Sequence, residues 1–219
     1  QFIRVNWLIM NRIIKITHVI FFLFGITSLG VNQTNLQLDK AKELVRNEIY
    51  FSFNEPKDWE KTSESFATNQ SNLVASYINR DYNSAIQLYI TPIPAKFKKS
   101  YETFFNNEKV VDEFINQSYP EPINKISDYK VIYINKVPFL SIIFHIDVSQ
   151  NIKNSPYYKP LKEQGYTDQQ IIQLSTQKTL SLITFQKGNM VNFGCTAVLN
   201  RFNELLPFFK KINQTIKIK

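Results

Sequence analysis

The stretch TLSLITFQKGNMVNFGCTAV, Thr179 to Val198, decides the fold. Two runs rich in β-branched and apolar residues flank Gln186-Lys187-Gly188-Asn189, which has the composition of a turn. Short runs of this kind, joined by a Gly-containing link, are typical of a β-hairpin. The stretch therefore predicts antiparallel strands over 179–185 and 190–198.

The residues that follow this hairpin predict a helix and a closing strand. Apolar residues recur at helical spacing from Asn200 to Asn213, which predicts a helix that buries one face. Pro207 lies inside this helix, so a kink is expected there. Thr215 to Ile218 is a candidate edge strand. The residues expected to be buried by the helix are Phe202, Leu205, Leu206, Phe209 and Ile212.

More strand-like runs precede the hairpin. Trp59 is expected to cover the edge of the core, and Leu36 to Arg46 is interpreted as a short polar helix or a lead-in. Arg80-Asp81-Tyr82-Asn83 has turn chemistry, so the strands on either side of it should pair. The predicted strands are 49–53, closed by Asn54-Glu55-Pro56, then 73–79, 85–91, 129–134 and 139–148, the last two joined by a turn at 135–138.

One long helix is expected between these strands. From Lys98 to Gln117, apolar residues recur at helical spacing and include Tyr101, Phe104 and Phe114. A stripe of aromatic residues on one helix face is typical of packing against a sheet. Tyr119-Pro120-Glu121-Pro122 then ends the helix.

Strands that come as hairpins, with helices between and after them, predict an α+β fold with an antiparallel sheet flanked by helices.

Ser149 to Gln177 contains the least strand-like sequence and is interpreted as an insertion loop between two strands. Thr167-Asp168-Gln169-Gln170 matches a capping box, so a short helix is expected over 168–174. Connections of this length are often functional.

The N-terminal part of the chain has the pattern of an export signal. Arg12 and Lys15 precede the apolar run from Val19 to Ile26, and small residues follow at Ser28 and Gly30. The apolar part is shorter than the roughly 20 residues that a spanning helix needs, which favours a signal peptide over a retained anchor. The predicted division is an upstream extension over 1–9, a signal peptide over 10–30 and one α+β domain over 31–219, which makes the protein secreted or periplasmic.

Charge and cysteine content restrict the function further. The net charge is +8, and loss of residues 1–30 removes three basic residues and no acid, which leaves +5. This surplus favours an acidic envelope surface or an unknown protein as partner. No dense Arg-rich run indicates nucleic acid, and membrane contact is expected only through the export signal. Cys195 is the only cysteine, so an intramolecular disulfide is excluded.

The order of elements resembles the PsbP-like family, an α/β/α sandwich. The residues that carry this resemblance are Ile49-Tyr50-Phe51-Ser52-Phe53 with Trp59, and the run from Thr179 to Ile218. The resemblance implies an accessory, binding or assembly protein without a shared catalytic site. The insertion at 149–177 departs from the family pattern, and no metal or partner residues are carried over.

The sequence lacks the motifs of common catalytic and metal sites. After loss of the signal, His145 is the only histidine, so multi-histidine zinc sites and thiolate clusters are excluded. A nucleophilic pair of Cys195 and His145 is the one thiol-based catalytic site that these residues allow. The expected alternative is that Cys195 is a small residue packed in the core. The sequence thus predicts no catalytic residue, metal site or cofactor, and a protein that is not an enzyme.

Three functions stay open at this point. The first is an exported accessory or binding protein that contacts a partner through Tyr157, Tyr158 and Tyr166 of the insertion, with a basic patch at Lys96, Lys98 and Lys99. The second is a small-ligand or lipid carrier with an apolar cavity between helix and sheet, lined by Phe104, Phe114 and Phe144. The third is a hydrolase that uses acids alone. The candidate acids are Asp58, Glu60, Asp112, Glu113 and Asp147.

Overall fold

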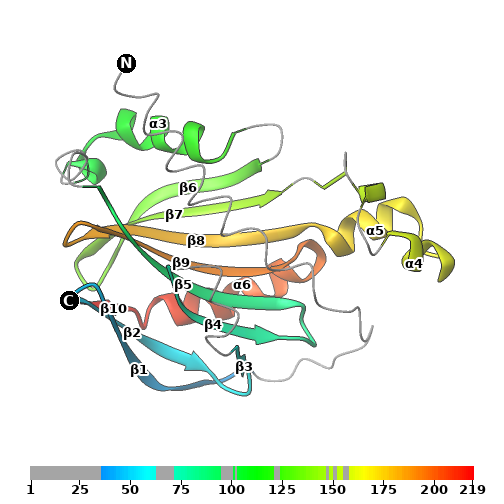
Figure 1. Ribbon diagram of the computed structural model, residues 1–219, viewed down its shortest axis with the longest axis horizontal. Coiled ribbons are helices and arrows are strands. Elements are labelled where there is room, and N and C mark those ends of the chain that lie inside the picture. The colour runs from blue at the N-terminus through cyan, green and yellow to red at the C-terminus, as the bar shows by residue number, and fades with distance from the viewer. Residues whose placement is uncertain are drawn as a thin grey trace.

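Strands are the commonest elements of the described chain and form two antiparallel sheets (Figure 1). The computed structural model describes residues 36–62, 72–94, 101, 103–120, 124–146, 148–149, 152–154 and 158–219. The strands are β1 (Leu38–Arg46), β2 (Ile49–Pro56), β3 (Glu60–Lys61), β4 (Leu73–Asn79), β5 (Ser84–Pro92), β6 (Asn124–Ile134), β7 (Val137–Ile146), β8 (Gln177–Gln186), β9 (Asn189–Val198) and β10 (Lys217–Ile218).

The larger sheet has seven strands in the order β3-β4-β5-β9-β8-β7-β6. The hairpin predicted from Thr179 to Val198 is confirmed as β8 and β9, with Leu182 opposite Phe193. The predicted hairpins β4–β5 and β6–β7 are confirmed as well. The β6–β7 turn is shorter than expected, because only Asn135–Lys136 link the strands and Val137 already pairs with Ile134.

The smaller sheet has the order β1-β2-β10 and corrects one expectation. Leu38 to Arg46 forms a strand, so the interpretation of 36–46 as a polar helix was wrong. Lys42, Leu44 and Arg46 are half-buried while the residues between them are exposed, which is the period of a strand. Pairing with β2 overrides the weak local preference of this polar sequence. The edge strand expected over 215–218 is confirmed as β10, which pairs with β2.

One face of the seven-stranded sheet packs against the small sheet and against α6 (Leu199–Asn213). Phe202 and Phe209 of α6 are buried there as predicted, whereas Leu206 is only partly buried. The ring of Phe53 lies 5.0 Å from that of Phe193, so rings of the two sheets are in contact. Trp59 is buried at the edge of this core, 5.9 Å from the ring of Phe208, which confirms its predicted place.

The opposite face is covered by α3 (Glu108–Ser118) and by the 3₁₀ helix η4 (Phe104–Asn106). The long helix was expected to begin at Lys98, but α3 begins at Glu108, so the predicted start was wrong. Asn107 has an extended backbone and accepts a hydrogen bond from the Val110 amide, which begins α3 after η4. The aromatic stripe faces the sheet as predicted, because Phe104 and Phe114 are buried with their rings 5.3 Å apart.

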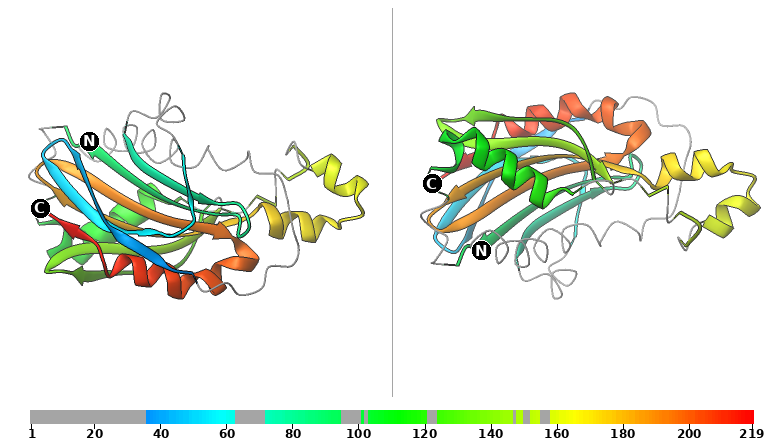
Figure 2. Two further views of the ribbon diagram at one scale, coloured as in Figure 1. Left: turned by 90° about the horizontal axis from the view of Figure 1, so that it is seen from below. Right: turned by 90° about the horizontal axis from the view of Figure 1, so that it is seen from above.

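Helices on both faces of an antiparallel sheet confirm the predicted α+β class and its three layers, which Figure 2 shows from two sides. The predicted signal peptide over 10–30 lies outside the described residues. Within the described part of the chain, no helix has the length and apolar character needed to cross a membrane.

Candidate functional site

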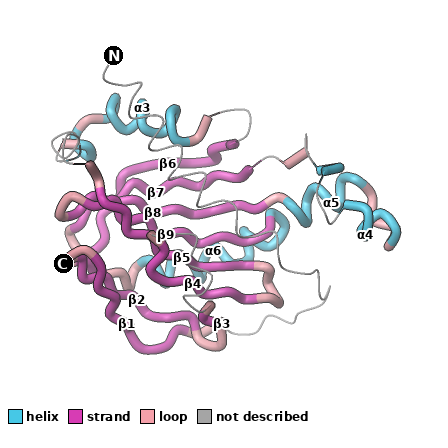
Figure 3. Tube along the Cα trace, in the orientation of Figure 1, coloured by secondary structure: helices cyan, strands magenta, loops and turns pink. Residues whose placement is uncertain are grey.

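The insertion predicted between two strands is a helical unit that projects from one end of the large sheet (Figure 3). It connects β7 to β8 and contains η5 (Ile152–Asn154), α4 (Tyr158–Glu163) and α5 (Asp168–Ser175). We call the described residues of this unit, 148–149, 152–154 and 158–176, the helical appendage. Both views in Figure 2 place it beyond the ends of the strands.

The helical appendage has a small hydrophobic core of its own. Ile152, Leu161 and Ile171 are buried in it, one from each short helix. Tyr158 and Tyr166, two of the three tyrosines expected to contact a partner, are half-buried against this core. The aromatic rings thus help to fold the unit, and the third tyrosine, Tyr157, lies outside the described residues.

The turn between α4 and α5 is closed by backbone geometry that only glycine adopts easily. Gly165 has φ +88° and donates to the Lys162 carbonyl at 3.0 Å, while the Tyr166 amide donates to the Leu161 carbonyl at 3.1 Å. This pair of bonds is a Schellman motif, which ends a helix and satisfies its last carbonyl groups. The contact of Tyr166 with Leu161 in the small core completes it.

The predicted capping box at the start of α5 is confirmed. The Gln170 amide donates to Thr167 Oγ1 at 3.2 Å, and the Thr167 amide donates to Gln170 Oε1 at 2.8 Å. The helix expected over 168–174 ends one residue later, at Ser175. Since both ends of the turn are closed by hydrogen bonds, α4 and α5 are held at a defined angle.

Three polar side chains join the two helices on their outer side. Tyr158 Oη donates to Asp168 Oδ1 at 3.0 Å, and Lys162 Nζ lies 3.0 Å from the same oxygen. The bond from Lys162, and then that from Tyr158, holds the pKa of the Asp168 carboxyl below its usual value. Partial desolvation and the hydrogen bond to Asp168 raise the pKa of Tyr158. Sequence reasoning missed this network, although the capping box placed Asp168 at the start of a helix.

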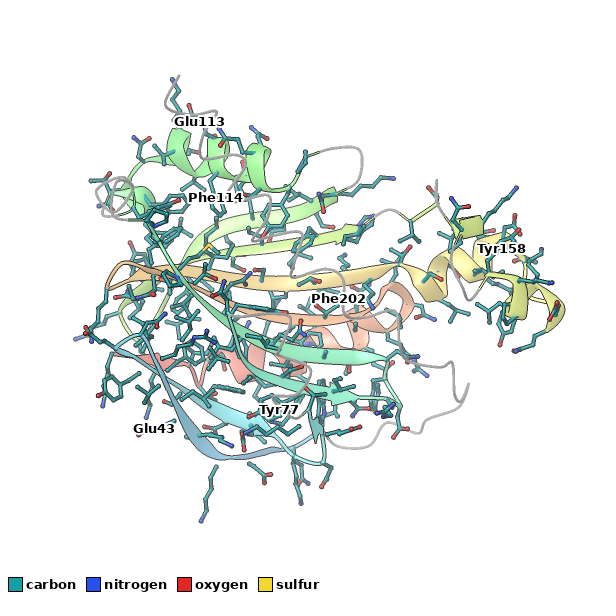
Figure 4. All side chains as sticks on the ribbon, viewed as in Figure 1. Glu43, Tyr77, Glu113, Phe114, Tyr158 and Phe202 are labelled. Atoms are coloured by element: carbon teal, nitrogen blue, oxygen red, sulfur yellow. The ribbon has the colours of Figure 1, made fainter. Side chains whose placement is uncertain are left out.

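The helical appendage is joined to the main layers at its C-terminal end. Thr176 is buried, and its amide donates to the Ile172 carbonyl at 2.8 Å. Its carbonyl accepts from the Leu199 amide at 2.9 Å, where α6 begins. Figure 4 shows Tyr158 on the appendage, well apart from Phe202 of the main core. The appendage is therefore firmly attached at its C-terminal end and has an outer surface that faces away from the sheets.

The remaining sequence-based candidates have different outcomes. Lys96, Lys98 and Lys99, the expected basic patch, lie outside the described residues. Phe104, Phe114 and Phe144, the expected lining of an apolar cavity, are all buried. Their neighbours are other rings, with Tyr119 4.6 Å from Phe144, so they belong to the packed layer between α3 and the sheet.

Cys195 packs in the core, which was the expected alternative to a nucleophilic pair with His145. It is fully buried on β9, with Sγ 3.9 Å from Asn213 Oδ1, and burial raises the pKa of its thiol. His145 is on β7, and β8 lies between these two strands. Among the described residues, no three histidine, cysteine, aspartate or glutamate side chains are grouped closely enough to hold a metal ion.

Comparison with solved structures gives 20 similar chains, among them the two below. Neither a protein-family model nor a curated protein sequence matches this chain. The chain is similar to cyanobacterial PsbP from Synechocystis, with 9% identity, a TM-score of 0.46 and coverage of 90% of this chain and 99% of that one. It is also similar to the Saccharomyces cerevisiae Ran-binding protein Mog1p, with 9% identity, a TM-score of 0.44 and coverage of 84% and 96%. No family and no function are carried over from either protein.

Proposed function

We propose that this chain is an exported, non-enzymatic binding protein and that the helical appendage is the surface through which it contacts a protein partner. The observation that carries this proposal is the construction of the appendage. It is a packed unit with its own core, placed outside the layers that stabilise the fold.

The position of the appendage in the chain supports a role beyond folding. Strands β7 and β8 are antiparallel neighbours, and their pairing extends to His145 opposite Lys178. A two-residue turn would join strands that end this close together. The chain instead places residues 147–176 there, and ordered insertions on a rigid scaffold often carry binding residues.

The outer surface of the appendage is suited to polar protein contacts. Gln164, Gln169 and Gln173 are exposed, and each amide both donates and accepts hydrogen bonds. Lys159 and Glu163 add one charge of each sign. Because the helices are already fixed by the small core and the capping box, little conformational entropy is lost when a partner binds.

The alternative functions receive less support. A nucleophilic role for Cys195 would require a thiolate, and burial keeps this thiol protonated. A carrier would require space between α3 and the sheet. The rings of Phe104, Phe114 and Phe185 lie within 6.3 Å of one another there.

The experiment is native mass spectrometry of the full chain purified from its host, compared with two kinds of variant. In the first, an Asn-Gly turn replaces residues 147–176 and joins β7 directly to β8. In the second, Gln169→Arg and Gln173→Arg change the exposed face of α5 and leave its buried face intact. Lys136→Gly, in the β6–β7 turn, is the matched control.

We expect the unaltered chain and the Lys136→Gly control to retain a second polypeptide that both appendage variants lose. The double arginine variant separates loss of the contact surface from any effect of the deletion on folding. A polypeptide retained by both appendage variants would refute the appendage as the contact surface. A retained small molecule without a polypeptide would favour the carrier function instead.

A further inference from the structure

Three hairpin turns meet at the end of the molecule opposite the appendage (Figure 1; Figure 2). They are Asn47–Glu48 between β1 and β2, Asn135–Lys136 between β6 and β7, and Lys187–Gly188 between β8 and β9. The last described residue, Lys219, lies beside them, because its amide and carbonyl both bond to Tyr50. We call these three turns, together with Tyr50 and Lys219, the turn end.

Hydrogen bonds hold the turn end together across the two sheets. Lys187 Nζ donates to the Glu48 carbonyl at 3.0 Å, and Asn47 Nδ2 donates to Asn189 Oδ1 at 3.2 Å. Asn135 Nδ2 donates to the Ile216 carbonyl at 2.7 Å. The tips are therefore fixed relative to one another, although they come from distant parts of the chain.

The turn end carries charged residues where the backbone favours glycine. Both central residues of each turn have positive φ, which is the geometry of a type I′ turn. Asn-Gly suits such a turn best, yet Glu48, Lys136 and Lys187 occupy left-handed positions with φ of 65°, 69° and 47°. All three side chains are exposed, and of these strained positions Lys187 is partly compensated by its bond to the Glu48 carbonyl, whereas the exposed side chains of Glu48 and Lys136 gain little from packing. Strain without a packing gain points to a role for the side chains in contact with something outside the molecule.

Basic and aromatic side chains are combined at the turn end. Lys136, Lys187 and Lys219 are exposed, and Glu48 is the only acid among the described residues of the three turns. Tyr50 is 51% exposed, with Lys187 Nζ 5.9 Å from its ring centre. Val45, its cross-strand partner, is 59% exposed, so an apolar pair lies beside the lysines.

We propose that the turn end docks on a bilayer that contains anionic lipid. Tyrosine rings and lysine side chains are both amphipathic, and together they suit the boundary between headgroups and acyl chains. An acidic protein would match the lysines, whereas an anionic bilayer combines negative headgroups with an apolar layer beneath them, which matches both the lysines and the adjacent exposed pair of Val45 and Tyr50. This contact extends the sequence-based expectation, which limited membrane contact to the export signal, and it is independent of partner binding by the appendage.

The experiment is co-sedimentation of the full chain with vesicles of phosphatidylcholine alone and of an equal mixture of phosphatidylcholine and phosphatidylglycerol. The test variant is Lys136→Gly with Lys187→Asn, which converts two turns to Asn-Gly but loses the Lys187 bond to the Glu48 carbonyl, so its thermal unfolding is measured beside that of the unaltered chain. The control is Lys40→Asn with Lys57→Asn, which removes the same charge at the other end of β1 and β2. Binding to pure phosphatidylcholine measures any contribution from the apolar run Val19 to Ile26.

We expect the turn variant to bind the mixed vesicles about 25-fold more weakly, since a lysine near an anionic surface contributes about fivefold in affinity. The control should keep most of the binding, and Tyr50→Ser should weaken it severalfold. Equal loss in the turn variant and the control would overturn the proposal, because only net charge would then matter. Binding of the unaltered chain to polyglutamate but not to the mixed vesicles would also overturn it, in favour of an acidic protein.

Discussion

The helical appendage and the turn end differ in how far apart along the chain their residues lie. The described contacts that form the small core of the appendage fall within residues 148–172. The turn end brings together residues near 48, 136, 187 and 219. The appendage is thus a local unit on the fold, whereas the turn end exists only when both sheets have formed.

Loss of a core ring should have the largest effect and should destabilise the turn end together with the rest of the fold. Phe51 is fully buried, with its ring 5.7 Å from that of Phe193 in the other sheet. Phe51→Ala removes this contact and leaves a cavity, so we expect a loss of about 3 to 5 kcal/mol in the free energy of unfolding by urea. Tyr50→Ala, one residue away and half-exposed, should lose less than about 1 kcal/mol. Equal losses would contradict the assignment of Phe51 to the shared core.

A cavity in the appendage should have a local effect. Ile171 is fully buried in the small core, so Ile171→Ala should destabilise that unit by about 2 to 4 kcal/mol. Hydrogen exchange should become faster for the amides of α4 and α5 and stay unchanged for β8 and β9. Faster exchange through the central strands would show that the appendage is part of the main cooperative unit.

Relief of strain at the turn end should stabilise the whole fold. Glu48→Gly gives the β1–β2 turn the preferred Asn-Gly pair and removes a left-handed residue that has a Cβ. We expect a gain of about 1 kcal/mol in denaturant unfolding. The bond from Lys187 is to the backbone carbonyl of residue 48 and is kept. Gln170→Gly within α5 is the contrasting change and should destabilise the appendage.

A change of pH should have the smallest energetic effect of these tests, and it should distinguish the helical appendage from the turn end. The pKa of Asp168 is lowered in the folded chain by Lys162 and Tyr158, so its contribution to stability is present above the unfolded pKa and is lost as the pH falls through the folded value. Amide exchange of α4 and α5, corrected for intrinsic rates, should therefore rise in acid. Asp168→Asn should remove this pH dependence. Amide exchange at the turn end, corrected in the same way, is the reference for this comparison.

The same contrast explains how much of the structure could be predicted. The hairpin from Thr179 to Val198 and the capping box at Thr167 are local patterns, and both were predicted correctly. α4 was missed because only the half-buried Tyr158 and the buried Leu161 of this short helix contact the small core, which is too short a pattern to indicate a helix. Its strongest signal was Gly165, which closes the turn.

Features that depend on tertiary pairing could not be predicted. Leu38 to Arg46 is a strand because β2 supplies its partner, and the polar sequence alone indicated a short helix or a lead-in. The start of α3 was misplaced because the aromatic stripe continues through η4, while Asn107 interrupts the helix. Sequence reasoning missed the turn end, because Lys136 and Lys187 are ordinary turn residues that lie far apart in the sequence. Only the fold brings their turns together.

The measurement that tests the separation of the two ends most directly is hydrogen exchange of the full chain with and without vesicles of phosphatidylcholine and phosphatidylglycerol. It locates the contact in the sequence, so binding through the apolar run Val19 to Ile26 is distinguished from binding through the fold. We expect slower exchange at 47–50, 135–137 and 187–189, with no change in α4 and α5. Protection of the appendage, or of none of these turns, would contradict it.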